Sequence, residues 1–167
     1  MTKSEIIALV RKLINDEQAT GYTDNANLEQ PDGTGELVNY LDRAVQAFSE
    51  QLAAAGDLRL IKTLSVSSGM NIPDDFLSFA GQVPVSVTGG TFSFYGHTTT
   101  LLIKYFARLP YVSDYGDSDK LPYTHDQEMK IAALAAVYAL NKHEFNVSQD
   151  LALLGMTGGA DNAAPTE

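Results

Sequence analysis

Hydrophobic residues at the start of the chain recur every three or four positions, which is the pattern of an amphipathic helix. Thr2 is followed three residues later by Glu5, as in a capping box at a helix N-terminus. We therefore expect a first helix over about residues 3–17. The next stretch, 19–35, is polar and rich in turn-forming residues. A connection of this length in a small domain is usually functional or mobile.

A second amphipathic pattern covers residues 36–55. Its apolar residues repeat along one stripe, and Gly56 follows where a helix stop is expected. Nearer the C-terminus, Thr124 begins another capping-box pattern, and the helix expected over about 125–143 is apolar nearly all the way round. We expect neighbouring elements to enclose this third helix.

The chain after the third helix has a weaker pattern. Residues 146–156 predict a short separate helix with Ser148 near its cap. The last residues, 157–167, are small, polar and rich in helix-breaking types. We expect them to form a flexible tail that becomes ordered only on a partner.

The segment between the second and third helices, 58–110, has the signals of strands and a hairpin. Apolar residues alternate with polar ones from 58 to 66. Three later runs are rich in β-branched and aromatic residues, over 83–88, 91–95 and 100–110. Gly89 and Gly90 join the first two of these runs, as a tight hairpin turn requires. This segment predicts a small, mainly antiparallel sheet.

The order of elements predicts an α+β fold. Two N-terminal helices and a C-terminal helix would form a helical bundle, with the small β-sheet inserted between them. A chain of 167 residues is the size of one domain, so residues 1–156 are expected to form a single domain that ends at the flexible tail.

Composition removes several classes of function. The chain has no cysteine, which excludes disulfides and thiol catalysis and agrees with folding in a reducing cytoplasm. It has 11 basic and 21 acidic residues and a formal net charge of -10, which opposes specific binding to nucleic acid. No apolar run approaches the length of a membrane span, which is about 20 residues. We expect a soluble protein with no membrane partner.

Adjacent carboxylates at Asp74 and Asp75 follow Pro73. A catalytic carboxylate pair must converge on one bond, whereas the side chains of adjacent residues generally point apart. Pro-Asp-Asp is typical of a turn that leaves a strand and starts a helical turn. We therefore interpret these three residues as a structural turn.

Acidic residues cluster once more at Asp114, Asp117 and Asp119. Oxygen ligands suit calcium, but this spacing lacks the bidentate Glu of an EF-hand loop. A solvated acidic loop is the better interpretation. The sequence gives no metal site.

The three histidines, His97, His125 and His143, are spread over the chain and no two have metal-ligand spacing. The glycines around Thr34 lack the surroundings of a phosphate-binding loop. We expect no catalytic residues, no cofactor and no enzymatic activity. A concave site that gathered His97 with Asp74 and Asp114 would favour an enzyme instead.

The order of elements, together with two short motifs, resembles the head–tail connector or adaptor proteins of tailed bacteriophages, in the variety with a β-sheet inserted between helices. The first motif is the turn Ile72-Pro73-Asp74-Asp75-Phe76, which in that family commonly follows a strand. The second is the strand end from Tyr105 to Pro110. The similarity of order covers about residues 6–154.

The resemblance implies a structural virion component in the head–tail neck, made in the host cytoplasm. It implies a homo-oligomeric ring of about twelve subunits that binds beneath the portal protein and extends the DNA conduit toward a tail or nozzle protein. An acidic conduit wall would let DNA slide past it. DNA would pass through the lumen without specific binding.

The resemblance also assigns residues. The portal-side anchors would be four apolar residues near the C-terminus, namely Leu151, Leu153, Leu154 and Met156. The loop that faces the tail or a neighbouring subunit would carry Asp114, Tyr115, Asp117 and Asp119.

A binding module of a phage accessory protein is the alternative. In that case the β-containing chain would recognise a receptor or a carbohydrate. Exposed Tyr95, Tyr111 and Tyr115 would form the platform, because aromatic side chains give a large contact area at low entropic cost.

Overall fold

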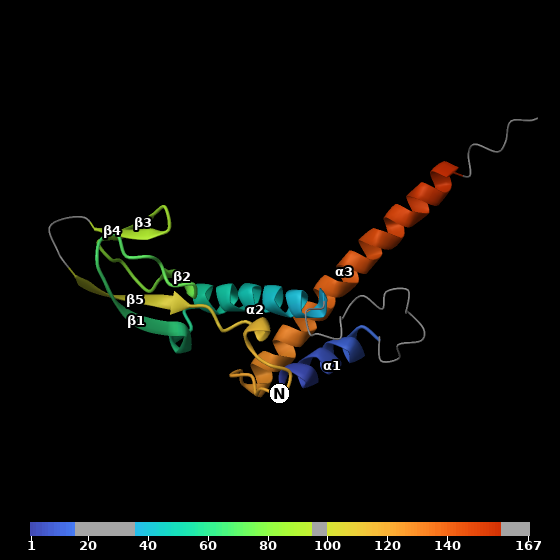
Figure 1. Cartoon of the computed structure of the whole chain (residues 1–167), viewed down its shortest axis with the longest axis horizontal. Helices are drawn as coiled ribbons and strands as arrows, with labels where there is room; N and C mark the ends of the chain where they lie inside the picture. Colours follow the sequence, from blue (N-terminus) through green and yellow to red (C-terminus); the bar gives the residue numbers. More distant parts are fainter. Residues whose placement is uncertain (16–35, 95–99, 158–167) are drawn as a thin grey trace, which may run out of the picture.

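The chain is an α+β protein, as the sequence predicts (Figure 1). In a computed structural model, residues 1–15, 36–94 and 100–157 are described, with side chains up to Asn141 in the last range. The helices are α1 (Lys3–Leu13), α2 (Glu36–Ala54) and α3 (His125–Thr157), and the short 3-10 helices are η2 (Leu58–Leu60) and η3 (Val112–Asp114). The strands are β1 (Ile61–Val66), β2 (Phe76–Phe79), β3 (Val85–Thr88), β4 (Thr91–Phe94) and β5 (Leu101–Ala107).

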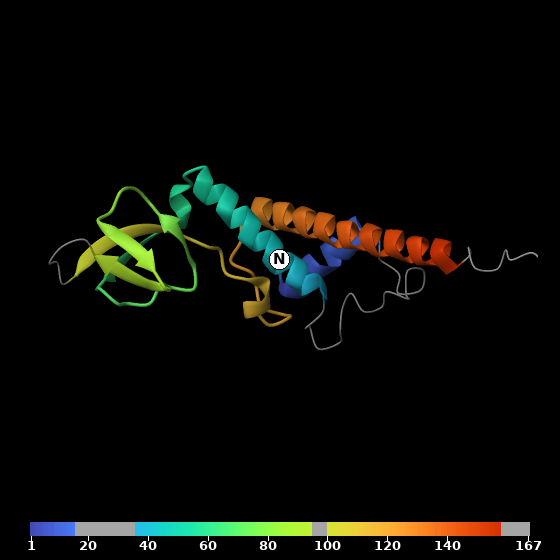
Figure 2. The same cartoon turned by 90° about the horizontal axis from the view of Figure 1, so that it is seen from above.

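The described residues bury two separate hydrophobic clusters. The first cluster belongs to the helical unit, which comprises α1, α2, η3 and α3, and includes Ile6, Leu41 and Ile131. The second belongs to the β unit, which comprises β1 to β5, and centres on Phe92 and Ile103. The β unit sits beyond one end of α2, away from α1, so the molecule is elongated (Figures 1 and 2).

Alanines let α3 pack closely in the helical unit. Ala132, Ala135, Ala136 and Ala139 are all buried on the side of α3 that meets α1 and α2. Small side chains allow helix axes to approach, so the larger side chains of the other helices can fill the space. The N-terminal half of α3 is therefore the centre of this unit.

Strands of the β unit form two antiparallel sheets. Strand β5 lies between β1 and β2, and β3 pairs with β4 in a separate hairpin. Gly89 and Gly90 form the hairpin turn with φ values of 56° and 80°, a left-handed conformation that other residues rarely adopt. The hairpin predicted from this Gly-Gly step is confirmed.

Helix α1 is shorter than predicted. It ends at Leu13 rather than near residue 17, because Asn15 takes a φ of 59° and its N–H donates to the Lys12 carbonyl. Asparagine tolerates this left-handed conformation better than most residues, and it commonly ends a helix. The pattern of apolar residues did not predict this end of the helix.

Helix α3 is much longer than predicted. The sequence suggested one helix over 125–143 and a separate one over 146–156, whereas the structure has a single helix from His125 to Thr157. This stretch contains no proline, and its only glycine is Gly155, so nothing in the backbone forces a break. Ser148 is inside the helix rather than at a cap.

The turn at Pro73 leads into a strand, not into a helical turn as the sequence suggested. The Phe76 N–H donates to the Pro73 carbonyl at 3.0 Å, which closes a turn through Asp74 and Asp75. Strand β2 follows immediately and pairs with β5. Phe76 and Phe79 then pack edge to face, with ring centroids 5.1 Å apart, and stabilise this side of the β unit.

Candidate functional site

The predicted portal-side anchors lie in the last turns of α3. All four positions, Leu151, Leu153, Leu154 and Met156, belong to one continuous helix. This half of α3 extends past α1 and α2 and projects from the helical unit (Figures 1 and 2). The structure thus places these positions on a projecting helix, and their side chains lie outside the described residues.

The N-terminal half of α3, whose side chains are described, carries exposed apolar side chains. Met129, Val137 and Leu140 are 40%, 50% and 44% exposed, respectively. Together with exposed Ala133 they recur every three or four residues, so they share one helix face. We call this set the outer stripe of α3, because its side chains are exposed, whereas the four alanines named above are buried. Neighbouring elements therefore do not enclose this helix on all sides, although its nearly continuous apolar sequence predicted that they would.

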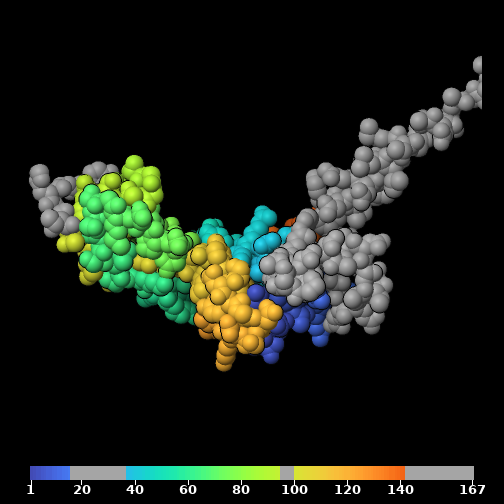
Figure 3. Space-filling model, in the orientation of Figure 1, coloured from blue at the N-terminus to red at the C-terminus, as the bar shows by residue number. Residues whose placement is uncertain are grey.

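The acidic loop between β5 and α3 is pinned to the start of α1 (Figure 3). The backbone N–H groups of Lys3 and Ser4 donate to the carbonyls of Asp119 and Asp117, at 3.3 and 3.1 Å. The Lys3 ammonium donates to the Tyr115 carbonyl at 3.1 Å. The loop is therefore attached to the helical unit by its backbone, while Asp114, Asp117 and Asp119 are exposed, as expected of a solvated acidic loop.

Two of the loop carboxylates shape the loop itself. Asp114 accepts from the Tyr111 N–H at 3.1 Å, and Asp119 accepts from the Gly116 N–H at 2.8 Å. The Asp117 side chain is more open, with 66% of it exposed and the Lys3 ammonium 3.7 Å away. These three carboxylates do not converge on a common point. Across the described ranges, no three His, Asp or Glu side chains form a group able to hold a metal ion.

Glu128 is a buried carboxylate in the first turns of α3. It forms an ion pair with the α-amino group of Met1, and the Met1 carbonyl accepts from the Leu121 N–H at 3.0 Å. His125 lies at the helix start with its Nδ1 3.7 Å from the other Glu128 oxygen. The His125 side chain is 81% exposed, so it is a surface residue. Sequence patterns gave no signal for a contact between the first residue and α3.

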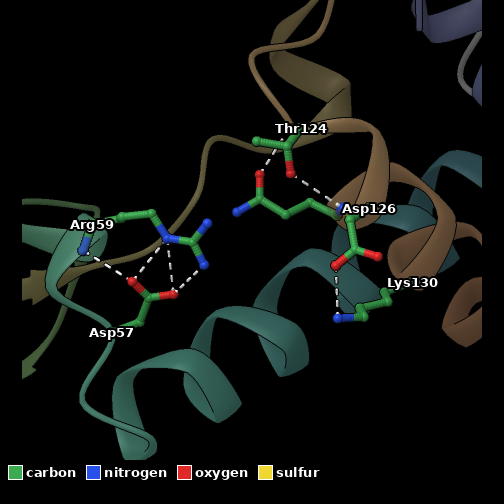
Figure 4. A network of polar contacts seen from close by, with 6 residues as sticks. Asp57, Arg59, Thr124, Asp126 and Lys130 are labelled. Carbon is green, nitrogen blue, oxygen red and sulfur yellow. Dashed lines mark hydrogen bonds and ion pairs between the residues drawn. The ribbon is translucent and has the colours of Figure 1, made fainter.

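The start of α3 and the end of α2 carry further polar contacts (Figure 4). Asp57 accepts two hydrogen bonds from Arg59 Nε and one from its Nη2, and this pairing lowers the pKa of Asp57 to about 2. Lys130 donates to Asp126 at 2.8 Å and lowers the pKa of that carboxyl. Thr124 forms the predicted capping box with Gln127. These contacts stabilise η2 and the start of α3.

Asp75 ties three parts of the β unit together. Its carboxylate accepts from the Lys62 ammonium at 2.5 Å and from the Tyr105 hydroxyl at 3.1 Å. Burial, with Asp75 adding to it, raises the pKa of Tyr105 to about 12. The Asp75 carbonyl also accepts from the Arg108 N–H at 2.6 Å. The interpretation of a structural turn fits these contacts, although the cross-strand partners had no sequence signal.

Polar side chains of α2 form hydrogen bonds with the segment that follows β5. Buried Ser49 accepts from the Leu109 N–H at 3.1 Å, and Asp42 accepts from the Val112 N–H at 2.7 Å. Between them, Gln46 accepts from the Tyr111 hydroxyl at 3.2 Å. The available signal was the placement of these three polar residues beside the apolar stripe of α2. It identifies no partner, so this contact could not be predicted from the sequence.

The tyrosines of the alternative binding platform do not form one exposed surface among the described residues. Tyr111 and Tyr115 are partly buried against the helical cluster. The Arg108 guanidinium lies over the Tyr111 ring, 3.2 Å from its centroid. Tyr95 lies outside the described residues, as does His97 of the enzyme alternative.

The fold and these contacts define an α+β protein whose outer surface includes a projecting helix with exposed apolar residues. Within the described part of the chain, no helix is long and apolar enough to cross a membrane. No protein-family model matches the sequence, and no curated protein matches it.

Proposed function

We propose that this protein is a structural component of a tailed-phage virion, a head-to-tail adaptor that forms a ring under the portal and extends the DNA conduit toward the tail. The proposal rests on the order of helices and strands and on one structural observation. That observation is the C-terminal half of α3, which projects from the helical unit and carries all four positions expected to bind the portal (Figure 1).

The two ends of α3 suit a protein that connects two partners. The acidic loop is attached to the start of α1 and precedes the first turn of α3 in the chain, whereas the expected portal-docking positions lie in the last turns of α3. A helix of 33 residues is about 50 Å long, at 1.5 Å per residue. The expected docking segment and the loop expected to face the tail or a neighbour are therefore separated by nearly the full length of a rigid element.

The distribution of charge refines the idea of an acidic conduit wall. The segment 16–35 contains five acidic residues and no basic one. By contrast, the loop acids Asp114 and Asp119 bind backbone N–H groups of their own loop. An acidic stretch that faced the conduit would oppose adhesion of DNA, because like charges repel each other.

Light scattering of the purified chain, alone and mixed with the portal protein encoded beside it, tests the proposal. We expect a stoichiometric, ring-sized complex on the portal. The double variant Leu153→Asp and Leu154→Asp should abolish docking, because charged groups replace apolar ones at the expected contact. Circular dichroism should show that this variant keeps its fold.

A matched control is Leu102→Asp, since Leu102 is 70% exposed on β5 and lies in the β unit. We expect this variant to bind the portal like the unchanged chain. Full docking by the Leu153→Asp and Leu154→Asp double variant would contradict the assigned segment. Absence of any complex between the unchanged chain and a folded portal would contradict the adaptor function itself.

A further inference from the structure

The outer stripe of α3 continues into the projecting half of the helix. The described stripe consists of Met129, Ala133, Val137 and Leu140. At the same helical spacing follow Glu144, Val147, Leu151 and Leu154. Seven of these eight positions are apolar, so one apolar line runs along about seven turns of a single helix.

The inner side of α3, which is buried in the N-terminal half, changes in polarity along the helix. In the N-terminal half it holds the alanines that pack on α1 and α2, and its last member in the helical core is Ala139. At the same spacing the projecting half has Lys142, Asn146, Gln149 and Asp150, followed by Leu153. The inner line is thus polar from Lys142 to Asp150, directly after the helical core ends, while the outer line is apolar apart from Glu144. What covers the apolar line must therefore approach from the outer side.

We propose that the apolar line binds the same line of a second copy of this chain, with the two α3 helices antiparallel. The length of the line favours a partner helix, and α3 is the longest of the described helices. Its pattern is nearly symmetric about residue 142. In an antiparallel pair, Val137 therefore lies opposite Val147 of the second copy, and Ala133 lies opposite Leu151.

Charge favours the antiparallel orientation over the parallel one. Parallel helices in register would place Glu144 opposite Glu144, and two facing carboxylates repel each other. In the antiparallel pair, Glu144 lies opposite Leu140. Seven apolar side chains from each copy would together bury on the order of 1,000 Å², which is the size at which specific interfaces begin.

This inference does not depend on the proposed function, because it concerns the chain without its portal. The dimer would cover Leu151 and Leu154, so portal binding would have to release it. A variant at Val137 separates the two ideas, because this residue belongs to the apolar line and lies outside the expected docking segment.

The mass of the purified chain in light scattering is the first test. We expect about twice the 18.0 kDa of one chain, and about 18.0 kDa for Val137→Asp. Leu102→Asp, an equally drastic change at an exposed position of β5, should remain a dimer. Thermal unfolding should show that both variants are folded. A monomeric mass for the unchanged chain, or a dimeric mass for folded Val137→Asp, overturns the proposal.

Cross-linking then tests the orientation, because the chain contains no cysteine of its own. We expect Val137→Cys and Val147→Cys, when co-expressed, to form a disulfide with each other under mild oxidation. Val137→Cys alone should form none, because its two copies would be separated by about ten residues, or roughly 15 Å along the axis. Efficient cross-linking of Val137→Cys to itself would indicate parallel helices and overturn the antiparallel arrangement.

Discussion

Glu128 and Asp126 are neighbouring acids in the first turns of α3 with opposite surroundings. Glu128 is 3% exposed and pairs with the Met1 α-amino group, whereas Asp126 is exposed and pairs with Lys130. We expect Glu128→Gln to lower the free energy of unfolding by about 1–3 kcal/mol, because it leaves the amino group without its buried partner. Denaturant unfolding measures this loss.

The matched variant Asp126→Asn should cost much less, because solvent screens its ion pair. Both variants lose one negative charge near the helix N-terminus, so they share the loss of the interaction with the helix dipole. Equal losses for the two variants would mean that the Met1 pairing contributes nothing.

Asp57 gives a prediction about pH. Its pairing with Arg59 lowers its pKa from 3.8 to about 2 in the folded protein. A lowered pKa stabilises the fold above the unfolded value, and this stabilisation is lost as the pH falls from about 4 to about 2. We therefore expect Asp57→Asn to be less stable than the unchanged chain at neutral pH.

The difference between the two proteins should shrink over that acidic range. Asparagine can still cap η2, so the variant isolates the ion pair from the cap. Thermal unfolding measured at several pH values provides the check. A stability difference that does not change with pH would contradict the role of the charge.

At the scale of residues, local contacts were predictable and distant ones were not. The capping boxes at Thr2 and Thr124 are confirmed, because both partners lie within one turn of sequence. The partners of Asp75 are 13 and 30 residues away, on other strands. Sequence spacing cannot predict contacts between strands when the register of the sheet is unknown.

Helix α2 depends on Ser49 for its hold on the chain that leaves β5. The Ser49 hydroxyl donates to the Val45 carbonyl at 2.6 Å and accepts from the Leu109 N–H. Ser49→Ala should lower the free energy of unfolding by about 1–3 kcal/mol, because the Leu109 N–H loses its partner in a partly buried place. Hydrogen exchange at Leu109 should become faster.

Gln51→Ala is a suitable control, since Gln51 is exposed on the same helix. We expect little change in its stability or in exchange at Leu109. Unchanged exchange at Leu109 in Ser49→Ala would show that this hydrogen bond does not hold the segment in place.

At the scale of elements, helices were predicted well where their stripes were regular. Helix α2 differs from its prediction by one residue, because Gly56 supplies a left-handed φ of 72° at the expected stop. The ends of α1 and α3 were wrong, since they depend on the conformation of Asn15 and on the absence of a break near residue 144. Strand β2 was missed because its four residues follow a turn that can equally begin a helix.

The two hydrophobic clusters of the described residues predict that the helical unit and the β unit unfold separately. Phe92 is fully buried in the β unit, and Leu41 is fully buried in the helical unit. We expect Phe92→Ala to cost about 3–5 kcal/mol and to increase hydrogen exchange in the β unit first. Leu41→Ala should do the reverse, with faster exchange in α1, α2 and α3.

Each variant serves as the control for the other. Hydrogen exchange followed by mass spectrometry resolves the two regions. If either variant accelerated exchange equally in both units, the two clusters would form one cooperative core.

At the scale of the whole molecule, the sequence predicted the α+β class and the order of helices and sheet. It did not predict two hydrophobic clusters, because apolar residues in the sequence do not reveal which of them meet. Phe92 and Val66 belong to one cluster, and Val112 and Leu121 belong to the other. This division depends on the path of the chain from the end of β5 to the side of α2. That path is fixed by hydrogen bonds to Ser49 and Asp42, which periodicity does not detect.

The two units also differ in when their residues become available during synthesis. Strands β1 to β5 all lie within one stretch of the sequence, 61–107, so the ribosome completes the β unit without making any other element in between. The helical unit joins the first residues of the chain to α3, which is made last. We expect the β unit to be complete before α3 has been synthesised. Until then, the apolar sides of α1 and α2 that pack on α3 remain exposed. A nascent chain stalled before residue 125 should therefore need protection from aggregation, and one released after residue 157 should not.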